Sequence, residues 1–235
     1  MNRIFILLFF MFIPAIVTGQ ISDSLFKALP DSLKPKGKGK NINYLEICKI
    51  IENTPREFTN QYYDEFNSLN KELEAEFKTN NSPEAKMICA ASICTFYGRI
   101  QTNKVEEKWN DQVIANGELV KRNSKILAVA YLNKAVFQSR HDRFTSAIEF
   151  LHKATEMAKM EGYKDVTADG YGILWRIHND LQLNHEALNY ANKLVGSLGD
   201  IPQNSITRYH AYIAKSFSYS KLYKTEKKRL TPILQ

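Results

Sequence analysis

Cysteine is scarce in this sequence of 235 residues, which contains only Cys48, Cys89 and Cys94. Cys89 and Cys94 are five positions apart on one expected helix, which separates them by about 7.5 Å of rise. That geometry excludes a disulfide between them. Two alternatives are left for Cys48: a bridge to one of the other two across a helix interface, or three buried free thiols, the state that such a sparse, odd set favours.

Motifs for catalysis and metal binding are also missing. The five histidines form no H-x-x-x-H pair and no H-E-x-x-H motif, and no P-loop, G-x-S-x-G or paired-carboxylate pattern occurs. His152 and Glu156 are one helical turn apart but are too few to make a metal site. The G-x-G at Gly37 and Gly39 has no preceding strand and no third glycine. The sequence therefore predicts no enzyme activity, no metal and no cofactor.

The only long apolar run is at the N-terminus, where Ile4–Ile13 follows Arg3 and precedes the small-residue end Val17–Gly19. This order predicts a secretory signal over residues 1–19, with a mature chain that starts at Gln20. The run is shorter than the roughly 20 residues that a membrane helix needs, although a short uncleaved anchor is an alternative. We therefore expect an exported protein, periplasmic or secreted, with no stable membrane span.

Charge is modest and mostly dispersed. The sequence has 32 Lys and Arg against 25 Asp and Glu, and loss of Arg3 with the signal leaves a net charge of +6. Such an excess suits loose association with acidic surfaces, but it is not clustered enough to predict nucleic-acid binding. Lys34–Lys40 combines lysines with two glycines and a proline, which predicts a flexible linker over residues 20–40. The other dense run is Lys224–Arg229.

No segment shows sustained period-two alternation, so the fold class is predicted to be all-α. Thr54-Pro55 and Ser82-Pro83 have the composition of helix starts, which places starts near 55 and 83. The predicted helices are 41–52, 56–78, 83–99, 104–121, 125–139, 144–160, 165–181, 185–195, 205–220 and 225–235.

Several of these helices repeat one another. Ala147, Ala187 and Glu226 share a register and are 40 and 39 residues apart. One helix pair cannot bury its apolar face alone, so neighbouring pairs are expected to stack. The small residues Ala135 and Ala147 would then allow the two helices of a pair to approach closely.

The repeated pattern resembles the tetratricopeptide repeat (TPR) family. The residues that carry the resemblance are Tyr131, Ala135, Phe144, Ala147, Leu151 and Ala154 in one copy, Tyr171, Leu174 and Ala187 in the next, and Ile213, Ala214, Phe217 and Tyr223 in the last. The resemblance implies an α-solenoid of antiparallel helix pairs, with an N-terminal helical pair at 41–82 and TPR-like repeats at 83–235. A unit near 40 residues exceeds the family's usual ~34, so other α-solenoids are an alternative.

The resemblance also implies a concave wall formed by the first helix of each pair and a non-catalytic function in binding a protein or peptide. We expect Arg176, Arg208 and Lys215 to contact carboxylates there, whereas a solvated helix face with no ligand is the alternative. The principal expected binding residues are Leu132, Val136, Arg140, Arg176, Asn179, Arg208 and Lys215. Val129, Ser139, Asp169, Gly172, Asp180, Ala211 and Ser218 complete the wall.

The last repeat is cut off by the end of the sequence, and its final segment 225–235 is apolar at its end. Such a surface predicts possible self-association through the C-terminal helix. The layout of a signal followed by irregular repeats also resembles the sensor portion of TPR-containing histidine kinases or transcriptional regulators. A truncated or stand-alone relative of such a sensor is therefore the alternative function.

Overall fold

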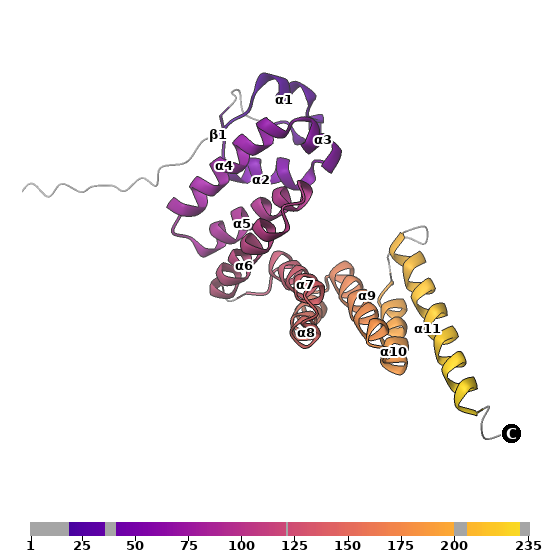
Figure 1. Cartoon of the computed structure of the whole chain (residues 1–235). Coiled ribbons are helices and arrows are strands. Elements are labelled where there is room, and N and C mark those ends of the chain that lie inside the picture. The colour runs from indigo at the N-terminus through magenta and orange to yellow at the C-terminus, as the bar shows by residue number, and fades with distance from the viewer. Residues whose placement is uncertain (1–18, 36–40, 121, 200–205, 231–235) are drawn as a thin grey trace, which may run out of the picture.

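The computed structural model of the chain is an all-α structure built from successive antiparallel helices (Figure 1). It describes residues 19–35, 41–120, 122–199 and 206–230. The α-helices in these residues are α1 (Asp23–Ala28), α2 (Tyr44–Asn53), α3 (Arg56–Gln61), α4 (Tyr63–Thr79), α5 (Pro83–Arg99), α6 (Asn103–Val120), α7 (Lys125–Arg140), α8 (Phe144–Met160), α9 (Lys164–Asp180), α10 (Asn184–Gly196) and α11 (Ile206–Leu230). The predicted fold class is confirmed. None of the described helices combines the length and hydrophobicity needed to cross a bilayer.

Local capping explains several helix starts. Ser82 accepts a hydrogen bond from the backbone N–H of Ala85 and is followed by proline at the first helical position of α5. Ser124 caps α7 in the same way. The cap expected at Thr54 is wrong, because its hydroxyl instead donates to the carbonyl of Ile50 in the preceding helix.

The same turn connects three helical hairpins, α5/α6, α7/α8 and α9/α10. Each turn places one residue in the left-handed region: Gln101 at φ 60°, Asp142 at φ 58° and Gln182 at φ 60°. These positions are 41 and 40 residues apart in the sequence. A left-handed residue just after a helix is a common helix stop, because it lets the next N–H groups bond back to the last carbonyls. The recurrence shows that residues 83–196 form three copies of one structural unit.

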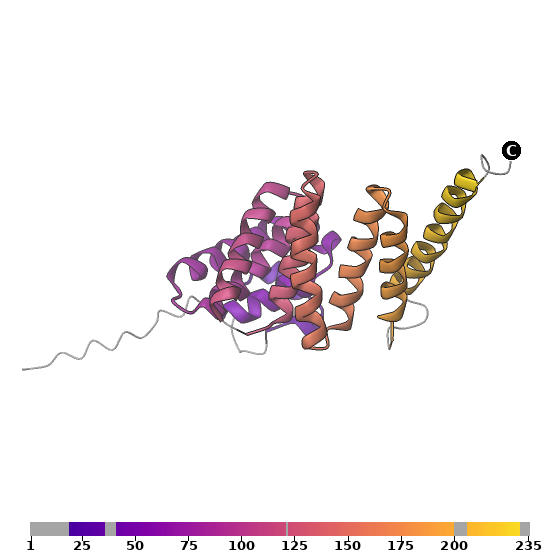
Figure 2. The same ribbon diagram turned by 90° about the horizontal axis from the view of Figure 1, so that it is seen from below.

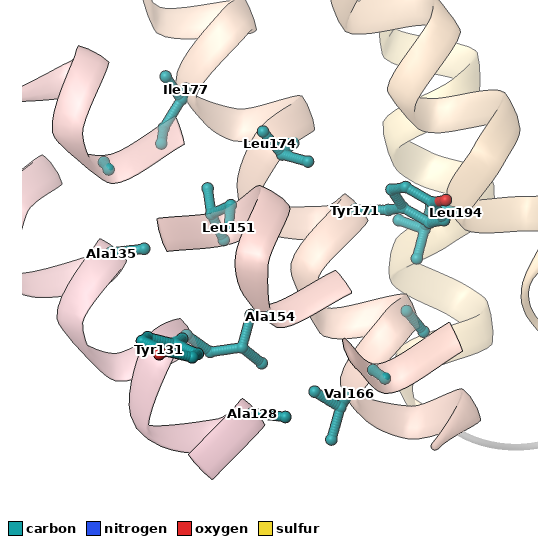
Figure 3. Packing of buried hydrophobic residues seen from close by; sticks show 14 of the residues in the cluster. Ala128, Tyr131, Ala135, Leu151, Ala154, Val166, Tyr171, Leu174, Ile177 and Leu194 are labelled. Carbon is teal, nitrogen blue, oxygen red and sulfur yellow. The ribbon is translucent and has the colours of Figure 1, made fainter. Parts of the chain in front are cut away.

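Small residues set the spacing of these helices. Ala135, Ala147, Ala154 and Ala168 are fully buried in the core that joins α7 to α11. Figure 3 shows Ala135 and Ala154 among the larger side chains of this core, including Leu151 and Leu174. A Cβ added at Gly170 would lie less than 3.0 Å from Cγ2 of Thr155 on α8. Alanine and glycine therefore fix the close approach of helices that the sequence pattern predicted.

The predicted flexible linker over residues 20–40 is wrong over its described part. Ile21, Leu25, Leu29 and Leu33 are all buried at spacings of four residues. They belong to a core that also contains residues of α2, α4 and α5. Strand β1 (Gly19–Gln20) pairs antiparallel with β2 (Asn41–Ile42), which closes this segment onto α2. Apolar periodicity outweighed the lysine, glycine and proline content; residues 36–40 lie outside the described residues, as does the predicted signal apart from Gly19.

Two helix boundaries also differ from expectation. The predicted helix 56–78 is divided into α3 and α4 at Tyr62, whose φ of −113° and ψ of 41° depart from helical values. The predicted break between 220 and 225 is absent, and α11 runs through it as one helix of 25 residues. In Figure 2 this helix stands beside α9 and α10 at the end of the row. The segment Lys221–Thr225 has neither glycine nor proline to stop the helix.

Candidate functional site

A hollow in the repeat region lies between α7, α9 and α11. Its volume is about 450 Å³. The floor is apolar, with Trp175 and Ile173 beside the valines of α7, and a few polar groups stand at its edge. Its lining consists of Val129, Leu132, Asn133, Val136, Ala168, Asp169, Gly172, Ile173, Trp175, Arg176, Leu194, His210 and Ala214.

A second hollow, of about 230 Å³, adjoins the first. Both are lined by Val129 and Asn133, so the two lie side by side at these residues and together extend from α5 across α7 and α9 to α11. We call this surface the trough. The second hollow is lined by Glu52, Ala91, Cys94, Asn110, Val113, Lys125, Ile126, Val129, Ala130 and Asn133.

Repeat symmetry explains how the trough is built. On α7 it is lined by Val129, Leu132, Asn133 and Val136, at the spacing of one helix face. On α9 the lining residues at the same spacing are Asp169, Gly172, Ile173 and Arg176, each 40 positions later. Equivalent positions of successive units therefore carry the surface, and the more polar second unit makes its α9 side different from its α7 side.

A buried acceptor without a partner lies in the second hollow. Asn110 is only 1% exposed, and its Nδ2 donates to the carbonyl oxygen of Ala130 at 2.9 Å. Its Oδ1 is also buried and has no hydrogen-bond partner. An unsatisfied buried polar atom costs about 1–3 kcal/mol. This unsatisfied atom is closed off from solvent and lowers stability where α6 packs against α7.

Opposite charges stand at the α9 side of the trough. Arg176 is exposed, two helical turns after Asp169. Partial burial, reinforced by the neighbouring Asp165, raises the pKa of Asp169, although Lys125 acts in the opposite direction. Lys125 is itself paired with Asp165 at 2.5 Å. This end of the trough can thus meet both a cationic and an anionic group.

The structure brings three of the seven principal expected residues into the trough: Leu132, Val136 and Arg176. Arg140 and Asn179 lie nearer the C-terminal ends of their helices and do not line it. Arg140 instead lies over the ring of Phe137, and Asn179 accepts a hydrogen bond from Lys221.

The two principal residues expected on α11 do not line the trough. Arg208 donates to the carbonyl of Gly199, and Lys215 is half-buried; neither lines the trough. His210 and Ala214 occupy that side instead. The connection from α10 to α11 spans residues 197–205, whereas only 161–163 join α8 to α9. A constant repeat length could not anticipate this longer connection.

Sequence reasoning missed Asn110, Asn133, Ile173, Trp175 and His210 as trough residues. Asn133 and Ile173 had a usable signal, since they are 40 positions apart and one helical turn after Val129 and Asp169. Asn110 had none, because its position depends on how α6 packs against α7.

The thiols are poorly suited to catalysis. All three cysteines are free and buried. A hydrogen bond with Cys48 and burial raise the pKa of Cys89, and burial raises the pKa of Cys94 to about 12. The thiols of Cys89 and Cys94 are therefore protonated at neutral pH, which makes them poor nucleophiles. In the described part of the chain, no group of three or more histidine, cysteine or acidic side chains is arranged to hold a metal ion.

Comparison with known proteins identifies a relative in fold alone. No family model and no curated protein matches the sequence. Among solved structures, the chain is similar to the crystal structure of BtubC (BKLC) from P. vanneervenii, with a TM-score of 0.65 and 12% identity. The match covers 78% of this chain and 77% of that one. The similarity supports the conclusion that this chain has an all-α, helical-repeat fold.

Proposed function

We propose that this chain is an exported, non-catalytic helical-repeat protein of the TPR type, which binds an extended segment of a partner protein in the trough. The observation that carries the proposal is the continuity of the two hollows through Val129 and Asn133. Continuity along equivalent repeat positions creates an elongated site, whereas a small molecule would favour one enclosed pocket.

The chemistry of the trough suits a peptide. Apolar side chains of a ligand would fill the two hollows, which are floored by residues such as Val113, Leu132 and Trp175. Asp169 and Arg176 would select polar groups at one end. Repeat proteins commonly use such concave surfaces for extended binding.

A variant whose added side chain fills part of the trough tests this function. Replacing Gly172 with Leu would place a bulky side chain in the first hollow, and the nearest atom to its Cβ would be Cδ2 of Leu194 at 3.9 Å, an ordinary contact. The matched control is Gly196→Leu on α10, where an added Cβ meets nothing within 4 Å and which does not line either hollow. Both variants are expected to fold, since Leu favours helices over Gly by up to about 1 kcal/mol.

A displayed library of random linear peptides would be selected on the wild-type chain, and the enriched peptides measured by fluorescence anisotropy. We expect Gly172→Leu to weaken binding at least about tenfold and Gly196→Leu to leave it within about twofold. Peptides that bind the wild type and Gly172→Leu equally would show that the trough is not the site.

Export is the second part of the proposal and rests on the signal pattern over residues 1–19. N-terminal sequencing of the protein recovered from the periplasm or medium of a bacterial host should give a first residue at or near Gln20. Recovery of a cytoplasmic product that begins at Met1 would contradict export while leaving the trough untouched.

A further inference from the structure

A stripe of tyrosines runs along the side of α11 that faces away from α10. Tyr209, Tyr212, Tyr219 and Tyr223 are 65%, 50%, 51% and 68% exposed. The opposite side of the helix carries Ala211, Ala214 and Ser218, all buried. With Ser216, the exposed residues are spaced by three and four in alternation. We call Tyr209, Tyr212, Ser216, Tyr219 and Tyr223 the α11 seam.

This spacing is that of a surface which pairs with another helix. Alternating steps of three and four average 3.5 residues, the repeat by which two helices keep one narrow stripe in contact. The two preceding hairpins show what such a tyrosine contacts. Tyr131 of α7 stacks on Phe150 of α8, with ring centroids 6.1 Å apart, and Tyr171 of α9 lies 6.4 Å from Tyr190 of α10. Among the described residues, no second helix supplies such a contact to the α11 seam.

Charge decides which kind of helix fits. The sequence of α11 contains seven lysines or arginines and one acidic residue, Glu226. Two copies of α11 would bring like charges together, which disfavours self-pairing. This argues against the self-association expected for the C-terminal helix. A helix with acidic residues flanking its apolar stripe would complement the lysines instead.

An anionic membrane would also attract a basic helix, but the exposed face is poorly suited to lipid. Its tyrosines alternate with Ser216 and Ser220, and the exposed Lys227 lies in line with Tyr209 and Tyr223. In the described part of α11, the exposed apolar side chains beside them are only Ile213 and Phe217, both 44% exposed. Helices that insert into an interface have a wide face of Leu, Phe or Trp. Tyrosine is instead enriched at protein interfaces.

We propose that the α11 seam docks an acidic amphipathic helix of a partner protein, in a manner separate from peptide binding in the trough. The helix would place apolar or aromatic side chains between the tyrosines and acidic side chains beside Lys224 and Lys227. Figures 1 and 2 show α11 at the end of the row of helices, where a partner helix can approach.

Two synthetic peptides provide the test. Each has three heptads with Leu at the two core positions, and they differ only in carrying Glu or Lys at the flanking positions, which also prevents either peptide from pairing with itself. Fluorescence anisotropy with the full chain should show binding of the acidic peptide and at least about tenfold weaker binding of the basic one. Equal affinity for the two peptides would overturn the proposal.

Substitutions in α11 test whether the acidic peptide binds at the α11 seam. The triple variant Tyr212→Ala, Tyr219→Ala, Tyr223→Ala should weaken binding of the acidic peptide at least about tenfold. The matched control, Leu119→Ala with Met160→Ala and Leu183→Ala, removes exposed apolar side chains elsewhere and should change affinity less than about twofold. Lys224→Glu with Lys227→Glu should also weaken binding about tenfold and reduce its salt dependence. Unchanged affinity in the tyrosine variant, with an unchanged helical spectrum, would exclude the seam.

Two other occupants of the α11 seam, a second copy of the chain and an anionic membrane, are tested in parallel. Sedimentation equilibrium of the full chain should show no dimer that depends on Tyr212, Tyr219 and Tyr223. Vesicles of phosphatidylserine and phosphatidylcholine should not bind through these tyrosines. A tyrosine-dependent dimer, or tyrosine-dependent vesicle binding, would each replace the acidic helix as the occupant and overturn the proposal.

Discussion

The core that extends from α1 to the first repeat helix, α5, and the core of the later repeats, from α7 onward, bury different kinds of side chain. Residues 19–100 pack large groups such as Phe66 and Phe96, both fully buried, around Leu25 and Ile51. The repeat region from α7 onward instead buries a series of alanines, including Ala135, Ala147 and Ala154. Large side chains fill the space between irregularly arranged elements and join them into one core. Small side chains let regular helices stack closely, and the stacked helices form a concave surface. The difference separates an irregular core from a core of regularly stacked helices.

The largest expected effect tests the first half of this comparison. Phe66→Ala removes a fully buried ring on α4 and should lower the free energy of unfolding by about 3–5 kcal/mol. Urea denaturation followed by circular dichroism measures it. Tyr209→Ala, at an exposed position, is the control and should change stability by less than about 0.5 kcal/mol. Comparable losses in both variants would contradict the assignment of Phe66 to a packed core.

A substitution that overpacks the contact between α8 and α9 tests the second half of the comparison, the close stacking of helices in the later repeats. Gly170→Ala adds a Cβ less than 3.0 Å from Cγ2 of Thr155 and should cost about 1–3 kcal/mol, measured in the same way. Thr155→Ser removes that methyl group and keeps a hydroxyl able to donate to the carbonyl of Leu151. The double variant should therefore recover most of the loss. If Thr155→Ser fails to rescue Gly170→Ala, the close approach of α8 and α9 is not what limits this position.

Removing one hydrogen bond between α9 and α11 tests how much that contact stabilises the attachment of α11 to the preceding helices. Nε1 of Trp175 donates to Oγ of Ser218 at 2.9 Å. Ser218→Ala leaves this indole N–H without its acceptor and should cost about 1 kcal/mol in thermal or urea unfolding. The control Ser216→Ala changes an exposed serine two positions away and should be nearly neutral. Equal effects of the two substitutions would show that this bond contributes nothing.

The last effect is a pH dependence at the boundary between the two regions, which is negligible at neutral pH and grows only in alkaline solution. Burial raises the pKa of Cys94 from 9.0 to about 12. The protonated thiol therefore stabilises the folded state below about pH 9, and this contribution is lost as pH rises toward 12. The urea midpoint of Cys94→Ala should fall less steeply over this range than that of the wild type. Parallel curves would mean that Cys94 ionises equally in both states.

The sequence predicted the helices best where local signals and burial agree. Ser82-Pro83 placed the start of α5 correctly, and the apolar spacing around Ala147 placed α8. The sequence-based prediction failed where it depended on one feature of a segment and ignored the others. Lysines and glycines suggested a linker, although Ile21 and Leu25 carry the periodicity of a packed segment. Thr54 had the composition of a cap, but its hydroxyl was taken by the preceding helix.

The same reasoning predicted only some of the residues that line the trough. Leu132, Val136 and Arg176 could be placed because one unit follows another at 40 positions, so a helix face recurs. Arg208 and Lys215 could not, because the connection over residues 197–205 shifts the register of α11. A shift of one residue turns a helix by about 100°, which is enough to move a side chain from one surface to another.

The sequence by itself determined that this protein is helical, that its units recur near 40 residues and that alanines sit where helices cross. These properties follow from periodicity and side-chain size, which are local. Only the tertiary structure decided that the two hollows join at Val129 and Asn133, that Oδ1 of Asn110 is left without a donor, and that the tyrosines of α11 face outward. Such features depend on distances between separate helices, which packing and the lengths of their connections set together.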